Sequence, residues 1–365
     1  MALAEISDVE RCVRERFKVK EVLLTSAISA EFSLSEGGPF QQRFEDLVRV
    51  LRPMGFIPIL RQSVSGPTIY VASTKGLPKR QLYLPVILFS VTMATVAVDG
   101  WLKSSALAAS ISDSGVIRDT LLYVAFMAAF LIVPFGVRYF FSIRSGAPPP
   151  IPYFIPGLPP SIPTFGALYS MSEPPVNRDD EMVPAVWATL SGLAIASVTL
   201  LAGLLDTRLI TQEAATATFG SSAHFVAQQL PLGLDYLVTA FLHPTSQGTI
   251  LSPLVFAGWF GFLISFANMI PTRQLEGWRI AGGFLGRRSL AVAALISIFV
   301  MVFVSFWMAL FIFAVSWGTR DLLPLDDISK ASRRDLYLLA LVLVLAALAY
   351  LLMLYPQLPT FPSIY

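Results

Sequence analysis

Residues 268–280 read Asn-Met-Ile-Pro-Thr-Arg-Gln-Leu-Glu-Gly-Trp-Arg-Ile and stand at the end of an apolar stretch, 250–271. A stretch of about 20 apolar residues is long enough to cross the roughly 30 Å of hydrocarbon in a membrane. Glu276 therefore lies close to hydrocarbon, beside the conformationally free Gly277. Because an ionisable side chain is costly to place there, Glu276 is a candidate functional residue.

Apolar residues dominate the rest of the chain as well. Of 365 residues, 55% are hydrophobic and 14% are charged, whereas soluble domains carry about 25% charged residues. A weak apolar segment, Ala223–Leu242, contains two glutamines and an aspartate and is predicted to be amphipathic or extracytoplasmic. The composition predicts a polytopic α-helical membrane protein embedded in a lipid bilayer. Six stronger runs predict its spans: Leu82–Trp101, Val116–Ile143, Met182–Leu205, Ile250–Pro271, Leu290–Trp317 and Leu336–Leu354.

Charge gathers in residues 1–80, which hold 21 of the 50 Asp, Glu, Lys and Arg side chains. Within this region, Phe40–Leu51 has helical spacing, and short β-branched and apolar runs predict strands in Val19–Leu34, Phe56–Leu60 and Thr68–Ala72. We therefore expect a small α+β N-terminal soluble domain, 1–80, followed by a transmembrane domain, 81–365, with about six to seven membrane segments.

Basic residues predict the orientation, because short cytoplasmic loops are enriched in Lys and Arg. Lys75, Lys79 and Arg80 precede the first span, and Arg138 and Arg144 end the second. The N-terminal domain is therefore expected to be cytoplasmic in a multi-pass protein.

The apolar run at 290–317 is too short for two full spans of about 20 residues each. A single crossing would place the next basic loop outside. We expect instead a re-entrant or tightly tilted helix pair that is broken near Ser305.

Eight of the 17 residues in 147–163 are prolines. Proline lacks a backbone N–H, so neither a helix nor a central strand is expected there. One interpretation is a stiff linker. The other is a membrane-associated loop near a site of substrate access, which the interleaved Tyr153, Phe154 and Phe165 suit well.

Several residue types exclude functions. The single cysteine, Cys12, excludes an intramolecular disulfide framework and a cysteine zinc cluster. A net charge of +2 gives no reason to expect nucleic acid as a partner. His224 and His243 fall on the predicted extracytoplasmic side, and each is expected to be solvated or packed rather than bound to a metal.

The opening motif resembles Asn-x-x-Pro…Leu-Asp-Gly of the site-2 proteases, a family of intramembrane zinc metalloproteases. Residues 152–156 with 164–167 resemble the loop after the family's zinc-binding helix, and 188–192 is a degraded match to the Gly-Pro-x-Ala-Gly of its third core helix. The resemblance covers nearly the whole chain in order. It is strongest to the larger archaeal, cyanobacterial and plastid relatives with an N-terminal soluble domain, and it implies a site-2-protease-like helical core.

In that family, the sequence His-Glu-x-x-His supplies two zinc ligands and the general base, and zinc activates a water molecule. No His-Glu-x-x-His occurs in this chain. Alignment of the resemblance on Tyr139 places the three positions at Pro134, Phe135 and Arg138. Proline has no ligating atom, phenylalanine takes no proton and arginine repels a metal ion.

The resemblance makes Glu276 the former metal-ligand position. No catalytic residue, no metal site and no cofactor are expected, although zinc serves the active family. If the family's geometry survives, Arg138 and Glu276 form an ion pair in the former zinc site, since a buried carboxylate needs a partner. The alternative is that Arg138 extends to the interface and Glu276 is hydrated.

The remaining motif residues allow two roles. Asn268, Pro271, Leu275 and Gly277 either form a structural turn or bind a substrate or client.

Asp99 and Lys103 flank Trp101 and are predicted to be interfacial anchors. Asp326 and Asp327 are predicted to lie in a solvated loop.

Three functions remain open. The first is an inactive homologue that keeps the scaffold and binds or regulates single-span membrane-protein clients or an active protease. The second is an active membrane metalloendopeptidase with an altered active site. The third is a membrane transporter, whose site would use helices broken at Pro134 and Pro271.

Overall fold

The structure is a computed structural model of the whole chain. It describes residues 2–26, 29–35, 40–64, 66–73, 82–111, 115–145, 147–171, 173–211, 231–242, 247–282, 284–316, 324–329 and 333–353. The predictions for His224 and His243, and for Lys75, Lys79 and Arg80, lie outside the described residues.

We call residues 2–73 the N-terminal module. Its elements are α1 (Ala2–Arg14), β1 (Val19–Ser26), β2 (Ser29–Leu34), α2 (Gln41–Leu51), β3 (Phe56–Ser63) and β4 (Gly66–Ser73). The four strands form an antiparallel sheet of order β1-β2-β4-β3. The predicted strands and the predicted helix are present, whereas the first helix was not predicted. Helix α2 places Phe44, Leu47, Val48 and Leu51 in the module's core.

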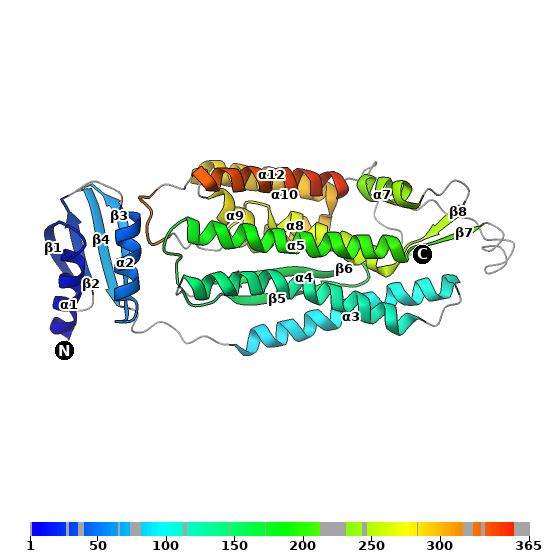
Figure 1. The fold of residues 1–365 in the computed structure, drawn as a ribbon, viewed down its shortest axis with the longest axis horizontal. Helices are drawn as coiled ribbons and strands as arrows, with labels where there is room; N and C mark the ends of the chain where they lie inside the picture. Colours follow the sequence, from blue (N-terminus) through cyan, green and yellow to red (C-terminus); the bar gives the residue numbers. More distant parts are fainter. Residues whose placement is uncertain are drawn as a thin grey trace.

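The helical part extends along the long axis of the molecule, with the module at one end (Figure 1). Among the residues that the structure describes, three helices are long and apolar enough to cross a membrane: α3 (Tyr83–Ile111), α4 (Val116–Arg144) and α5 (Asp179–Asp206). The other helices are shorter. They are α7 (Leu232–Leu242), α8 (Pro253–Asn268), α9 (Glu276–Ala281), α10 (Arg287–Val304), α11 (Phe306–Ser316) and α12 (Arg333–Met353).

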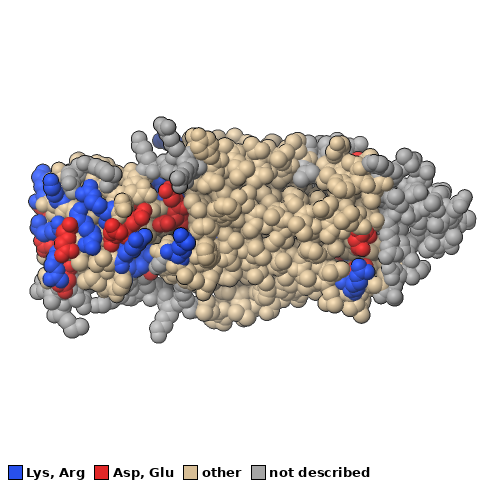
Figure 2. Space-filling model, in the orientation of Figure 1, with Lys and Arg blue, Asp and Glu red and all other residues tan. Residues whose placement is uncertain are grey.

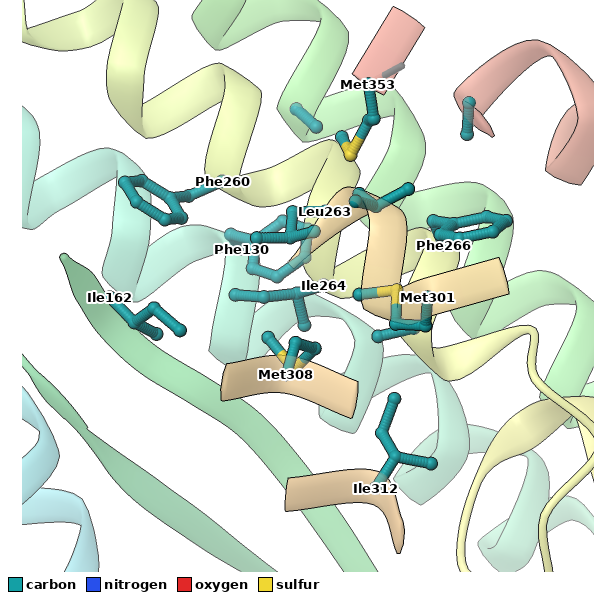
Figure 3. Packing of buried hydrophobic residues seen from close by; sticks show 14 of the residues in the cluster. Phe130, Ile162, Phe260, Leu263, Ile264, Phe266, Met301, Met308, Ile312 and Met353 are labelled. Atoms are coloured by element: carbon teal, nitrogen blue, oxygen red, sulfur yellow. The ribbon is translucent and has the colours of Figure 1, made fainter. Parts of the chain in front are cut away.

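Helices α5 and α8 form the centre of this part because small residues let their backbones approach closely. A Cβ added at Gly258 would lie 2.5 Å from the backbone nitrogen of Leu200, and one at Gly203 would lie 2.3 Å from that of Val255. The surrounding core includes Phe130 from α4 and Met301 and Met308 from α10 and α11 (Figure 3).

The predicted break near Ser305 is confirmed. Helix α10 ends at Val304, Ser305 is extended with φ −157° and ψ 109°, and α11 begins at Phe306. The Ser305 hydroxyl accepts a hydrogen bond from the Met308 N–H at 3.4 Å, as the N-cap of a new helix does.

The proline-rich segment is not a linker, and that interpretation was wrong. It forms β5 (Ile151–Leu158), which pairs antiparallel with β6 (Ile162–Ser170). Each strand of a two-stranded hairpin has a free edge, where a missing N–H costs no ladder hydrogen bond. The hairpin packs against the helices, with the Phe89 and Phe154 ring centroids 5.1 Å apart.

Two loops of the helical part join the module. The edge of β3 pairs with residues 325–327, where the Leu60 N–H donates to the Leu325 carbonyl at 2.8 Å. Asn177 donates to Glu45 at 2.7 Å. Burial lowers the pKa of the nearby Arg61 guanidinium, while Asp327 and Asp326 oppose that shift.

Asp326 therefore does not lie in a solvated loop, which corrects the prediction. It is 1% exposed, and its carboxylate accepts hydrogen bonds from the backbone of Ile328 and Ser329 at 3.0 Å each. Charged side chains gather over the module on the face in Figure 2, and a broad middle band of the helical part shows none there. This distribution is typical of a membrane-associated protein.

Candidate functional site

Four elements bring charged side chains together at the end of the helical part nearer the module. Helix α4 supplies Arg138, and α9 supplies Glu276 and Arg279. The first turn of α5 supplies Glu181, and β6 contributes Tyr169. We call these five residues the ion cluster.

Arg138 and Glu276 are in direct contact. The Arg138 Nε donates to Glu276 Oε1 at 2.7 Å, and Arg138 Nη2 contacts Glu276 Oε2. Their side chains are only 1% and 5% exposed. Arg138 therefore lies against Glu276 instead of extending to an interface, and the burial of both side chains favours the ion pair over the alternative. A hydrogen bond between two charged groups is stronger than one between neutral groups.

Arg279 joins the pair from the next turn of α9. Its Nη1 lies 3.7 Å from Glu276 Oε2, and its Nε lies 3.6 Å from Glu181 Oε1. Its Nη2 donates to the Tyr169 carbonyl at 3.4 Å, and the Arg138 guanidinium lies 4.9 Å from the centre of the Tyr169 ring. Two guanidiniums thus face two carboxylates, which is the balance that a buried cluster requires.

Arg279 was not predicted as a site residue, although its side chain is buried in the cluster. The three-residue spacing from Glu276 to Arg279 was the available signal, since such residues are neighbours on a helix. Glu181 and Tyr169 gave no comparable signal.

Packing around the turn before α9 accounts for two residues of the 268–280 motif, Leu275 and Gly277. A Cβ at Gly277 would lie 2.0 Å from the Met269 carbonyl oxygen, so only glycine lets α9 start against this backbone. Leu275 is buried in the core. These two residues present no surface to a client and have packing roles, whereas Pro271 is half-buried in the turn.

A small cavity of about 30 Å³ lies beside Glu276. Pro134 and Asn268 line it, together with Thr189 and Gly192 from the degraded third-helix motif. Phe135 does not line it and instead contacts Tyr139, with ring centroids 6.0 Å apart. The structure therefore brings Pro134, Asn268 and Glu276 to one place and leaves Phe135 outside.

Helix α4 continues through Pro134 to Arg144. The prediction that Pro134 breaks this helix was therefore wrong. The transporter interpretation required two broken helices, and α4 is not one of them. The break predicted at Pro271 is the end of a helix, since α8 ends at Asn268, before Pro271.

Zinc does not fit these residues. Pro134 offers no ligand atom, and the Glu276 carboxylate already faces Arg138 and Arg279. Two fixed cations at this distance repel a metal ion. Among the residues that the structure describes, no three His, Cys, Asp or Glu side chains are grouped to hold one.

A larger cavity of about 680 Å³ opens next to the ion cluster, between the module and the helical part. Arg138 lines it together with Ser142 at the end of α4, and apolar atoms make up most of its wall. Its volume is in the range of sites that bind small molecules. Six prolines contribute to the wall: Pro53, Pro148, Pro150, Pro174, Pro175 and Pro184.

Asp99 and Lys103 form a second buried charged group, far along α3. Asp99 is 0% exposed and accepts hydrogen bonds from Lys103 and from the Tyr123 hydroxyl. The prediction of interfacial anchors was wrong for Asp99, because apolar neighbours and Tyr123 enclose its carboxylate.

The fold and the ion cluster together define a membrane-associated, mostly helical protein with a small sheet module. Its sequence is similar to that of plant zinc metalloproteases. It is 30% identical over 169 residues to the probable zinc metalloprotease EGY2, chloroplastic, of Oryza sativa, a match that covers 46% of this chain and 30% of the rice protein.

The Arabidopsis thaliana protein of the same name is 26% identical over 139 residues, which cover 38% of this chain and 24% of that protein. The matches thus span about a third or less of these curated relatives. No family model matches the chain, and no solved structure matches it. The likeness supports a distant relationship to proteases of the site-2 type.

Proposed function

We propose that this protein is a non-catalytic relative of the site-2 proteases that binds membrane-protein clients instead of cleaving them. The observation that carries the proposal is the Arg138–Glu276 ion pair at the position where the resemblance places zinc. Hydrolysis by this family needs a metal-activated water and a general base. The residues at those positions, Pro134, Phe135 and Arg138, supply neither.

The client would be a single-span membrane protein, or an active protease that this protein regulates. The cavity beside Arg138 supports this, since it could take a short extended segment next to the ion cluster. Asn268 and Pro271 would contact the client at the turn. No role with nucleic acid is proposed.

We further propose that the chain is a multi-pass membrane protein whose N-terminal module is cytoplasmic. Supporting this arrangement, Arg144 and Arg138 at the end of α4 line one cavity together with Arg52 of the module. The lipid bilayer would surround α3, α4 and α5.

A crosslinking experiment in native membranes tests the proposal. A photoreactive residue at Ser142, which lines the larger cavity, should give discrete adducts with membrane proteins. The control is Val133, which lies on the same helix and is 40% exposed. Fragment analysis of the crosslinked proteins should find no cleavage product that depends on Glu276. A product that disappears in Glu276→Ala would show that the protein is a protease.

A further inference from the structure

A row of polar side chains crosses one face of α3. Thr95, Asp99 and Lys103 follow one another at four-residue intervals, so they share one side of the helix. All three lie in a segment that is apolar and long enough to span a membrane. Polar and charged side chains are costly at such a depth, and each needs a partner.

Two of these residues bind the turn of the β5–β6 hairpin. The Thr95 hydroxyl shares its proton between the Thr92 carbonyl of α3 at 2.8 Å and the Pro163 carbonyl at 3.0 Å, and it accepts from the Gly157 N–H at 3.3 Å. The Lys103 ammonium donates to the Pro160 carbonyl at 3.2 Å. Residues on both sides of the turn are therefore fastened to α3.

Asp99 holds Lys103 in place. One carboxylate oxygen accepts from the Lys103 ammonium and the other from the Tyr123 hydroxyl of α4. Asp99 and Tyr123 are both 0% exposed. Gly100 permits this approach, because a Cβ there would lie 2.8 Å from the Tyr123 ring.

Aromatic rings complete the surroundings of the ammonium. Lys103 Nζ lies 5.5 Å from the centre of the Phe260 ring and 6.0 Å from that of Phe256, both on α8. A desolvated cation is stabilised by such rings. One side chain thus connects α3, α8 and the hairpin turn, and through Asp99 it reaches α4.

The hairpin also forms a wall of the ion cluster. Gly166, Ala167 and Tyr169 of β6 line the small cavity beside Glu276. We propose that Asp99, Lys103 and Tyr123 form a latch that fastens the hairpin turn to α3 and so positions this wall from its far end. The three are positioning residues, and the inference holds whether or not the proposed client binding is correct.

Thiol accessibility tests the latch in the full-length protein. Cys12 is the only cysteine, so Cys12→Ser removes the background. Ile162→Cys then places a reporter in the hairpin, where the side chain is 3% exposed, and Ala185→Cys places a matched reporter in α5, where it is 0% exposed. A buried thiol reacts with a maleimide only when its surroundings open.

Lys103→Met should raise the alkylation rate at residue 162 by about tenfold or more, as expected when a charge-assisted hydrogen bond is lost. The rate at residue 185 should stay unchanged. Tyr123→Phe, which removes only the hydroxyl, should give a smaller rise at 162 alone. The control Arg118→Met removes an ion pair whose arginine is 68% exposed and should change neither rate.

Equal rises at 162 and 185 would mean that Lys103 only stabilises the fold, and they would overturn the proposal. Unchanged rates at 162 in both latch variants would overturn it as well. If Lys103→Met does not fold, the Tyr123→Phe comparison decides alone.

Discussion

At the residue scale, a buried carboxylate and a buried guanidinium are stable only as a pair. Arg138 and Glu276 are among the least exposed charged side chains of the described residues. Removing one partner from such a pair costs about 3–5 kcal/mol, whereas replacing both by apolar residues is often neutral.

Arg138→Met alone and Glu276→Leu alone should therefore each lower the free energy of unfolding by about 3–5 kcal/mol. The double variant should lose much less than the sum of the two. Chemical denaturation of the purified protein in mild detergent gives the coupling energy. The exposed pair Arg11–Asp8 serves as the control and should show almost no coupling. Additive losses at Arg138 and Glu276 would show that the two side chains do not interact.

Glycine at position 277 is a second requirement at this scale. Gly277→Ala should destabilise the protein by several kcal/mol, since the added Cβ would overlap the Met269 carbonyl at 2.0 Å. Gly136→Ala in α4 is the matched control, because nothing lies within 4 Å of a Cβ there. It should be neutral or stabilising by about 0.5–1 kcal/mol. Equal melting temperatures for the two variants would contradict the packing described for the turn.

At the scale of elements, apolar runs predicted the positions of the long helices well, because a run of about 20 apolar residues can be identified from residue types alone. Ser305 was identified as a break because 28 residues are too many for one span and too few for two. Strand β5 was missed because its prolines are typical of a linker. The pairing with β6, which places these prolines in a two-stranded hairpin, is visible only in the structure.

Ser305→Ala should weaken the start of α11, since the hydroxyl caps the Met308 N–H. The expected loss is about 0.5–2 kcal/mol, and hydrogen exchange should increase at Met308 and its neighbours. Ser289→Ala is the control, because that side chain is exposed near the start of α10. An unchanged exchange rate at Met308 would mean that Ser305 has no capping role.

The candidate site could be predicted only in part. Arg138 and Glu276 were paired in advance because a resemblance placed them at one former metal site. Arg279 was missed although it follows Glu276 by three residues, a spacing that places two side chains on one side of a helix. Glu181 and Tyr169 come from elements that are distant in sequence, and only the packed fold brings them to the cluster.

At the scale of the whole molecule, the module lies at one end (Figure 1), and Arg138 of the ion cluster borders the cavity between the module and the helical part. In the proposed membrane orientation, cysteines at Ser7 and Gln274 should react with an impermeant maleimide from the cytoplasmic side. A cysteine at Gly115, between α3 and α4, should react from the opposite side. Labelling of all three from one side would contradict the multi-pass arrangement.

The central claim is that a guanidinium–carboxylate pair occupies the place of a metal. Elemental analysis of the purified full-length protein, prepared without chelator and equilibrated with zinc, tests it most directly. We predict that zinc stays well below one ion per chain and that Glu276→Ala does not change it. One tightly held zinc ion per chain, lost in Glu276→Ala, would contradict the account.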